Sequence, residues 1–232
     1  MSPTCIVLAG GLGTRLRSAV PDRPKCLAPV GARPFLALQL QLLQRRGIER
    51  IVLALGHGAA AVRDAVMAFD GALRVDSVVE PSPLGTGGAL RHALRAWGLA
   101  EALVVNGDTW IDADLAGLQR PLGGGESMRL GLVRVADRAR YGGVALDESG
   151  RITHFAPSGR PGPGLVNAGI ARLTLAAFDA VADSVPCSLE VDVLPALAGR
   201  GALGGVVLEG DFIDIGVPED YRLFCARHGG AA

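Results

Sequence analysis

The segment AGGLGTRL at residues 9–16 has the residue types of a phosphate-binding turn. It follows a short apolar run at residues 5–9, and Lys25 lies ten residues beyond Arg15. We expect a strand, a glycine-rich turn and then a helix, because this order exposes backbone N–H groups at a helix N-terminus, where anions bind. Arg15 and Lys25 would add positive charge beside a polyphosphate. The segment therefore predicts that the protein handles a nucleotide.

Two better-known glycine-rich loops do not match this segment. A P-loop closes with Gly-Lys-Ser or Gly-Lys-Thr, and the chain contains neither sequence. The dinucleotide fingerprint requires a third glycine where this chain has Leu16. An ordinary glycine-rich turn between a strand and a helix stays open as the alternative, although Arg15 and the Pro24-Lys25 pair argue against it.

Two aspartates are candidate ligands for Mg²⁺. Asp108 follows an apolar run at residues 102–105, and Asp214 lies between Ile213 and Ile215. A carboxylate is costly to bury unless it is paired or bound to a metal, and Mg²⁺ typically takes one or two protein carboxylates plus phosphate oxygens of the substrate. A turn or helix-capping role is the alternative for Asp214.

A second glycine-rich loop, EPSPLGTGGA at residues 80–89, could approach a nucleobase. Glycine permits close approach of the backbone to a flat ring, and the Glu80 carboxylate could accept an N–H group of a base. The alternative is a plain helix N-terminus capped by Thr86.

The elements that must position these residues alternate through the first half of the chain. Apolar runs at residues 51–55 and 102–105 predict strands, and helical spacing at residues 35–43, 62–69 and 86–97 predicts helices. This βαβ order predicts a mainly parallel sheet with helices on both faces, and ligands at the carboxyl ends of its strands.

The second half of the chain has a different pattern. We expect extended segments at residues 128–136, at 144–155 with a turn at 147–150, and at 165–174. Helices are expected at residues 175–181 and 190–197, and Pro218 suits the first turn of another. No internal repeat is visible.

The composition excludes several function classes. The 232 residues carry 23 Lys+Arg and 23 Asp+Glu, and this formal net charge of zero favours neither nucleic acid nor an anionic membrane as partner. No apolar run approaches the roughly 20 residues of a membrane span, and no secretory signal is visible. The four cysteines are scattered without metal-ligand spacing. We therefore expect a cytoplasmic protein.

The ordered motifs resemble those of the sugar-1-phosphate nucleotidyltransferases over nearly the whole chain. They are LAGGLGTRL, Pro24-Lys25, EPSPLGTGGA, NGDTW, YGGV at 141–144, NAGI at 167–170, SLE at 188–190 and DFIDIG at 211–216. The resemblance implies a single-domain Rossmann-like α/β fold of the GT-A type over residues 1–232. Its nucleotide-binding part would cover roughly residues 1–115 and its sugar-binding part roughly residues 116–232.

The resemblance also implies roles for individual residues. Arg15, Lys25, Asp108 and Asp214 would be catalytic, and both aspartates would bind Mg²⁺. The nucleotide would contact a larger set: Leu8, Ala9, Gly10, Gly11, Gly13, Thr14, Arg15, Lys25, Glu80, Gly85, Thr86 and Asp108. The sugar phosphate would contact Gly142, Asn167 and Glu190.

One position departs from the family pattern. Members often carry a Glu-Lys pair before the NAG segment, and that lysine binds the sugar phosphate. The corresponding positions here fall near Pro157 and Ser158. We hypothesise that Arg160 supplies the missing charge.

The resemblance implies transfer of a nucleotidyl group from a nucleoside triphosphate to a sugar 1-phosphate, with release of pyrophosphate. The ending FIDIGVPEDY favours GTP and a heptose 1-phosphate, whereas PLGTGGA also resembles the mannose-1-phosphate guanylyltransferases. Uridylyl or thymidylyl transfer to another sugar phosphate is a further alternative. A module that binds nucleotide sugars without catalysis is the alternative from another class. The sequence makes no prediction of oligomeric state.

Overall fold

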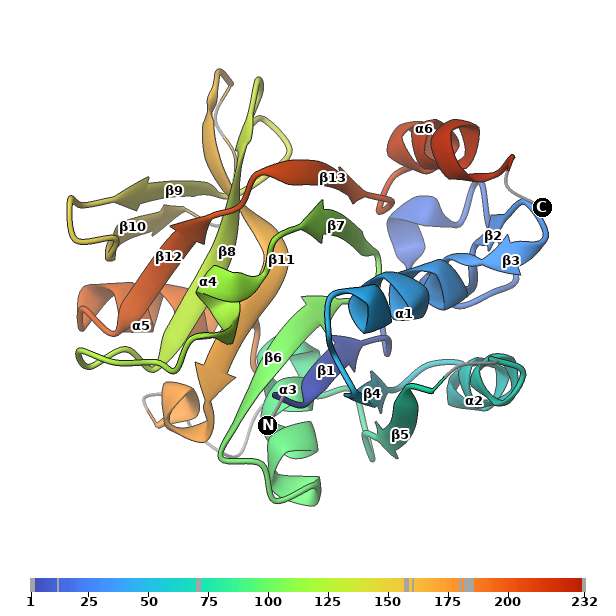
Figure 1. The fold of residues 1–232 in the computed structure, drawn as a ribbon, viewed down its shortest axis with the longest axis horizontal. Helices are drawn as coiled ribbons and strands as arrows, with labels where there is room; N and C mark the ends of the chain where they lie inside the picture. Colours follow the sequence, from blue (N-terminus) through green and yellow to red (C-terminus); the bar gives the residue numbers. More distant parts are fainter. Residues whose placement is uncertain are drawn as a thin grey trace. The chain divides into compact units, whose positions relative to one another are not determined.

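The chain forms two compact units in the computed structural model. The model describes residues 3–11, 13–69, 72–156, 159, 161–179, 181 and 186–230. The first unit comprises residues 1–82, 105–112 and 211–232, and the second comprises residues 83–104 and 113–210. Figure 1 shows the helices and strands of both units with their labels.

The first unit is built on parallel strands with helices between them. Its elements are β1 (Cys5–Leu8), the 3₁₀ turns η1 (Thr14–Leu16) and η2 (Lys25–Leu27), β2 (Pro29–Val30), β3 (Arg33–Pro34), α1 (Phe35–Arg45), β4 (Arg50–Leu55), α2 (Ala59–Met67), β5 (Arg74–Val79) and α6 (Pro218–His228). β1 pairs in parallel with β4, and β4 pairs in parallel with β5 (Figure 1). The expected βαβ order is confirmed here.

Three strands have residues in both units. They are β6 (Glu101–Asn106), β7 (Thr109–Ala113) and β13 (Gly210–Asp214). In the first unit, the end of β6 adjoins β1, because the N–H of Gly107 donates to the carbonyl of Leu8 at 2.9 Å. β7 and β13 pair as a separate two-stranded sheet.

The second unit is a mixed sheet with short helices. Its elements are α3 (Gly85–Ala96), α4 (Ala116–Gln119), β8 (Met128–Val135), β9 (Gly143–Leu146), β10 (Ile152–Ala156), β11 (Gly164–Thr174), the 3₁₀ helix η3 (Leu175–Phe178), the π-helix η4 (Leu189–Val193), α5 (Leu194–Gly199) and β12 (Leu203–Val207). β11 pairs antiparallel with β8 and β9, whereas β12 pairs parallel with β8.

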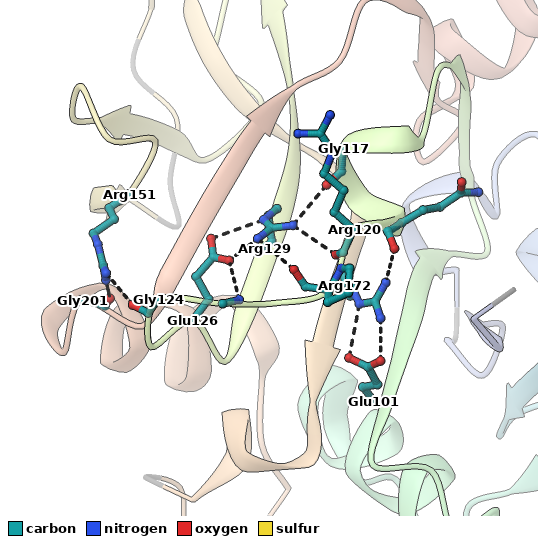
Figure 2. A network of polar contacts seen from close by, with 12 residues as sticks. Glu101, Gly117, Arg120, Gly124, Glu126, Arg129, Arg151, Arg172 and Gly201 are labelled. Carbon is teal, nitrogen blue, oxygen red and sulfur yellow. Dashed lines mark hydrogen bonds and ion pairs between the residues drawn. The ribbon is translucent and has the colours of Figure 1, made fainter. Parts of the chain in front are cut away.

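Arginine side chains connect elements of the second unit (Figure 2). Arg172 on β11 lies opposite Arg129 on β8 and is only 5% exposed. Its guanidinium forms a bidentate ion pair with the carboxylate of Glu101 on β6 and donates to the carbonyl of Gln119. Arg129 pairs with Glu126 in the same way. The guanidiniums of Arg129 and Arg172 thus each have a carboxylate partner, and their further donors bind carbonyls of neighbouring segments.

Two expected helices are different in the structure. The turn after β1 leads into η1, which has only three residues of 3₁₀ helix, so no α-helix follows the glycine-rich segment. Gly13, the residue before η1, has the left-handed conformation, and Leu16 within η1 is buried. Within the helix expected at residues 175–181, the structure has the 3₁₀ helix η3 over Leu175–Phe178, and residue 180 lies outside the described residues. No helix in the described ranges is long and apolar enough to cross a membrane.

Candidate active site

The carboxyl ends of β1, β4 and β5 bring three backbone segments together. Gly10 follows β1, Gly56 follows β4 and Glu80 follows β5. A Cβ at Gly10 would lie 2.8 Å from the backbone nitrogen of Gly56, and a Cβ at Gly56 would collide with the Glu80 carboxyl group. These positions therefore require glycine, and the Glu80 carboxylate lies against the backbone of Gly56 beside Gly10.

The glycine-rich turn after β1 presents backbone donors. Gly13 has a φ of +59°, a conformation that glycine adopts without strain. The N–H groups of Gly11, Thr14 and Arg15 in this turn have no backbone acceptor among the described residues. The Arg15 side chain is exposed. The turn can therefore offer several N–H groups and a guanidinium to an anion, although the helix expected behind it is absent.

Lys25, Asp108 and Asp214 form one ionic cluster in the first unit. The Lys25 ammonium pairs with Oδ2 of Asp108 and lies 4.0 Å from Oδ1 of Asp214. The side chains of Lys25 and the two aspartates are 13%, 24% and 23% exposed, so water screens their charges only in part. A Cβ at Gly216 would lie 2.8 Å from Lys25 Nζ. The absence of a side chain at Gly216 thus makes room for the cluster.

The environment of Asp214 opposes its negative charge. Burial raises the pKa of Asp214, and the nearby Asp108 carboxylate raises it further. The Lys25 ammonium, the N–H of Gly216 and the Arg15 guanidinium lower this pKa, but the net shift is upward. Two carboxylates with more negative charge than their surroundings offset are suited to an additional cation.

Backbone and side-chain hydrogen bonds fix the turn that carries Asp108. The buried amide of Gln39 on α1 donates to the carbonyls of Asn106 at 2.9 Å and Thr109 at 2.6 Å. The N–H of Ile215 donates to the carbonyl of Asp108 at 2.9 Å. The segments of the two aspartates are thus joined directly by their backbones.

The two carboxylates fit a divalent cation. A positive group, the Lys25 ammonium, already lies next to both. No group of three or more His, Cys, Asp or Glu residues that could hold a metal occurs in the described part of the chain. A pair of carboxylates agrees with the chemistry of Mg²⁺, which completes its shell with water and substrate phosphates.

In the second unit, Thr86 and Glu190 meet although they are 104 residues apart. The Thr86 hydroxyl donates to Oε2 of Glu190 at 2.9 Å. Gly85 has a φ of +74°, and a Cβ there would lie 2.5 Å from the carbonyl oxygen of Cys187. Both predicted positions, 85 and 86, therefore contact the segment that carries Glu190.

Asn167 lies in an irregular part of β11. The pairing of β11 with β8 shifts register between Asn167 and Ala171, and Gly169 within the shift has a φ of +67°. The N–H of Gly169 donates to Oδ1 of Asn167 at 3.0 Å. The oxygen of this amide is therefore used within the strand, and its nitrogen can donate to a ligand. Gly142, also selected from the sequence, packs against the carbonyl of Ala156, where no Cβ would fit.

A model of the nucleotidyl transferase family matches residues 4–223. The chain belongs to this family. The transferase is 35% identical to the D-glycero-alpha-D-manno-heptose 1-phosphate guanylyltransferase of Campylobacter jejuni, over 94% of this chain and 97% of that protein. It is 32% identical to the enzyme of the same name from Aneurinibacillus thermoaerophilus, over 94% of each chain.

Two solved structures are similar to this chain over nearly its whole length. The transferase is similar to HddC from Yersinia pseudotuberculosis, with a TM-score of 0.86, 32% identity and coverage of 97% of this chain and 99% of that chain. A second structure of HddC, complexed with GMP-PN, matches with a TM-score of 0.84 and 33% identity over the same shares. These likenesses confirm the α/β fold and the family predicted from the motifs.

The structure places the selected residues of this transferase in two groups. The first unit holds the glycine-rich turn, Arg15, Lys25, Glu80, Asp108 and Asp214, and the second holds Gly85, Thr86, Gly142, Asn167 and Glu190. Arg160 lies outside the described residues, as do Pro157 and Ser158. The charge proposed for Arg160 stays a prediction.

Sequence reasoning missed three residues that shape the site. Gly56 and Gly216 matter because of what lies across from them, namely the carboxyl group of Glu80 and the Lys25–Asp214 contact. Gln39 is a polar residue at 2% exposure on an otherwise apolar helix face. That single polar residue within an apolar pattern was the one available signal, because a buried amide needs partners.

Proposed function

We propose that the protein transfers a guanylyl group from GTP to a heptose 1-phosphate, forming a GDP-heptose and pyrophosphate. Relatives that carry this activity in their names match almost the full chain from end to end. The observation that carries the proposal in this chain is the ionic cluster of Lys25, Asp108 and Asp214 beside the donors of the glycine-rich turn.

The reaction needs no general base. A phosphate oxygen of the sugar 1-phosphate is already ionised, and it attacks the α-phosphorus of GTP. A new P–O bond forms, the bond between the α-phosphorus and its bridging oxygen breaks, and pyrophosphate leaves with the electron pair. Catalysis then consists of positioning two anions and stabilising the charge that develops.

The residues of the first unit suit the triphosphate. The N–H groups of the turn and Arg15 would bind the phosphates, and Lys25 would neutralise charge at the attacked phosphorus. The Glu80 carboxylate would accept the two neighbouring N–H groups at the edge of guanine, an arrangement that thymine and uracil lack. Glu80 therefore favours GTP among the triphosphates.

Mg²⁺ is the metal that we propose for Asp108 and Asp214. When bound, the ion would offset the charge of the phosphates and of both aspartates. The second unit would supply the sugar contacts, with the Asn167 amide as donor and the Glu190 carboxylate as acceptor for hydroxyl groups. Because GTP is made and used in the cytoplasm, we place the protein there.

A panel of substrates tests this proposal. The purified protein is incubated with GTP, ATP, UTP or dTTP and with heptose, mannose or glucose 1-phosphate, and pyrophosphate release is measured. We expect the fastest turnover with GTP and heptose 1-phosphate, none after chelation with EDTA, and recovery when Mg²⁺ is added back.

Variants of one residue make the test specific to the site. Asp108→Asn should lower kcat by at least about 100-fold while the protein keeps its thermal midpoint, since an uncharged amide is a poor Mg²⁺ ligand. Asp112→Asn is the matched control, because Asp112 pairs with Arg46 outside the cluster. Faster turnover of mannose 1-phosphate than of heptose 1-phosphate would show that mannose 1-phosphate is the substrate. Full activity of Asp108→Asn would refute the metal assignment.

A further inference from the structure

Two segments of the second unit are joined by a set of hydrogen bonds that the reaction itself does not explain. The N–H of Cys187 donates to the carbonyl of Leu84 at 2.8 Å. In return, the N–H groups of Gly87 and Gly88 donate to the carbonyl of Cys187 at 2.9 and 3.1 Å. Three backbone hydrogen bonds therefore join the start of α3 directly to the segment before η4.

One side chain, Thr86, extends this connection to Glu190. The N–H of Leu189 donates to the Thr86 hydroxyl oxygen at 2.8 Å, and that oxygen lies 2.9 Å from Oε2 of Glu190. A hydroxyl has one proton and two lone pairs. Because the Leu189 N–H occupies a lone pair, the hydroxyl proton is directed to the Glu190 carboxylate.

The two oxygens of Glu190 are in different situations. Oε2 accepts from Thr86 and, at 3.3 Å, from the hydroxyl of Ser188. Oε1 has no hydrogen-bond partner among the described residues, and the side chain is only partly buried. One oxygen is thus anchored, and the other is available to a ligand.

The backbone around Glu190 is itself unusual. Glu190 lies in the first turn of η4, a π-helix of five residues. The N–H of Val193 reaches the carbonyl of Ser188 at 3.3 Å across this widened turn. Single π turns occur frequently at functional sites, because they displace a side chain from the regular helical position.

We propose that Thr86 is a positioning residue for sugar selection: its hydroxyl holds Oε2 of Glu190, so that Oε1 is presented to a hydroxyl group of the sugar 1-phosphate. This inference rests on the proposed function. It gives Thr86 a role different from the nucleotide contact expected from the sequence, because Thr86 acts through Glu190.

Kinetics of Thr86 variants test this assignment. Thr86→Val keeps the shape of the side chain and removes the hydroxyl, whereas Thr86→Ser keeps the hydroxyl. We expect Thr86→Val to raise KM for the sugar 1-phosphate about tenfold, which corresponds to about 1.4 kcal/mol. For Thr86→Val, KM for GTP should stay within about twofold of the wild-type value. For Thr86→Ser, KM for the sugar 1-phosphate should likewise stay within about twofold of the wild-type value.

A double-mutant cycle with Glu190→Ala shows whether Thr86 acts through Glu190. In the Glu190→Ala background, Thr86→Val should change the sugar KM less than about twofold, because its target is gone. Ser188→Ala provides a second variant that removes the weaker donor together with the cap that Ser188 gives to the N–H of Val191, and we expect a smaller rise of the same KM. Thermal midpoints are measured for every variant, so that loss of folding is recognised directly.

The outcomes are distinct. Independent effects of Thr86→Val and Glu190→Ala would overturn the inference, and so would a Thr86→Val variant impaired in KM for GTP alone. If Thr86→Val does not fold, an unchanged sugar KM in Ser188→Ala would also overturn it. If the wild type turns over no pair of triphosphate and sugar phosphate, the proposed function fails, and this inference fails with it. Turnover by the wild type with a failed cycle rejects the inference alone.

Discussion

Lys25 is the only lysine in a chain whose Lys and Arg residues total 23, so every other cationic side chain is an arginine. Its ammonium pairs with Asp108. Gly13 and Gly216 lie close to the Lys25 side chain and leave little space around it. A Cβ at Gly13 would lie 3.0 Å from the Cβ of Lys25, and one at Gly216 would lie 2.8 Å from its Nζ. A compact ammonium fits this space, whereas a planar guanidinium is larger and orients its donors differently.

Replacement of Lys25 by arginine should therefore fail to preserve activity. We expect Lys25→Arg to lower kcat on the order of 100-fold, close to the loss in Lys25→Gln, since the first variant displaces and the second removes the charge proposed to act at the attacked phosphorus. The measurement is pyrophosphate release with saturating substrates. Arg17→Lys, at an exposed position of the same segment, is the control and should stay near the wild type. Full activity of Lys25→Arg would show that charge alone suffices.

Residue types were sufficient to select Lys25, Asp108 and Asp214, because charged groups within apolar or glycine-rich segments are rare without a purpose. The same reasoning could not find Gly216. A glycine carries no chemistry of its own, and its importance depends on the Lys25 and Asp214 side chains that lie across from it. Such relations are set by the folded chain and are absent from the local sequence.

Among the elements, α1 has a role beyond filling the core. Its buried Gln39 donates to the carbonyls on both sides of the Asp108 turn, at Asn106 and Thr109. The helix therefore helps to fix the turn that carries Asp108.

Gln39→Met removes both hydrogen bonds and nearly conserves side-chain volume. We expect the free energy of unfolding to fall by about 1–3 kcal/mol, because two carbonyls lose their donor inside the protein. Urea unfolding followed by circular dichroism measures this change. Gln44→Met, on the half-exposed side of the same helix, should change the free energy by no more than about 0.5 kcal/mol. Equal effects of the two variants would contradict the role given to Gln39.

Elements with strong apolar patterns were predicted well, and those with weak patterns were not. Residues 51–55 and 102–105 are continuous buried runs, and both are strands. β5 has half-exposed residues such as Asp76 and Ser77, and β12 contains Gly204 and Gly205, so neither has the composition typical of a strand. These two strands form because neighbouring strands offer them a partner, which a local window does not contain.

At the scale of the whole molecule, the first unit depends on residues from distant parts of the chain. One buried cluster contains Phe35 of α1, Trp110 of β7, Ile213 of β13 and Phe224 of α6. The rings of Phe35 and Trp110 meet Phe224 edge-on, with centroids 5.1 and 5.3 Å away. This packing holds β13, which carries Asp214, and β7, which follows the turn that carries Asp108.

Truncation of Phe224 should therefore destabilise the unit strongly. We expect Phe224→Ala to lower the free energy of unfolding by about 3–5 kcal/mol, the range for a buried aromatic residue that leaves a cavity. Leu223→Ala is the matched control, because Leu223 precedes Phe224 in the same helix and is 44% exposed. Its effect on the free energy of unfolding should be below about 1 kcal/mol. Thermal or urea unfolding compares the two. A loss below about 1 kcal/mol in Phe224→Ala would mean that α6 is dispensable for folding.

The first unit is assembled from residues 1–82, 105–112 and 211–232, and this division has a consequence for synthesis on the ribosome. A nascent polypeptide that has reached residue 210 contains Lys25 and Asp108 but lacks Asp214 and Phe224. Phe35 of α1 and Trp110 of β7 therefore stay incompletely covered until residues 211–232, which supply Ile213 and Phe224, have been translated. Chaperone demand and susceptibility to proteolysis should therefore be greatest late in translation, and the two aspartates proposed to hold the metal are both present only after elongation has passed residue 214.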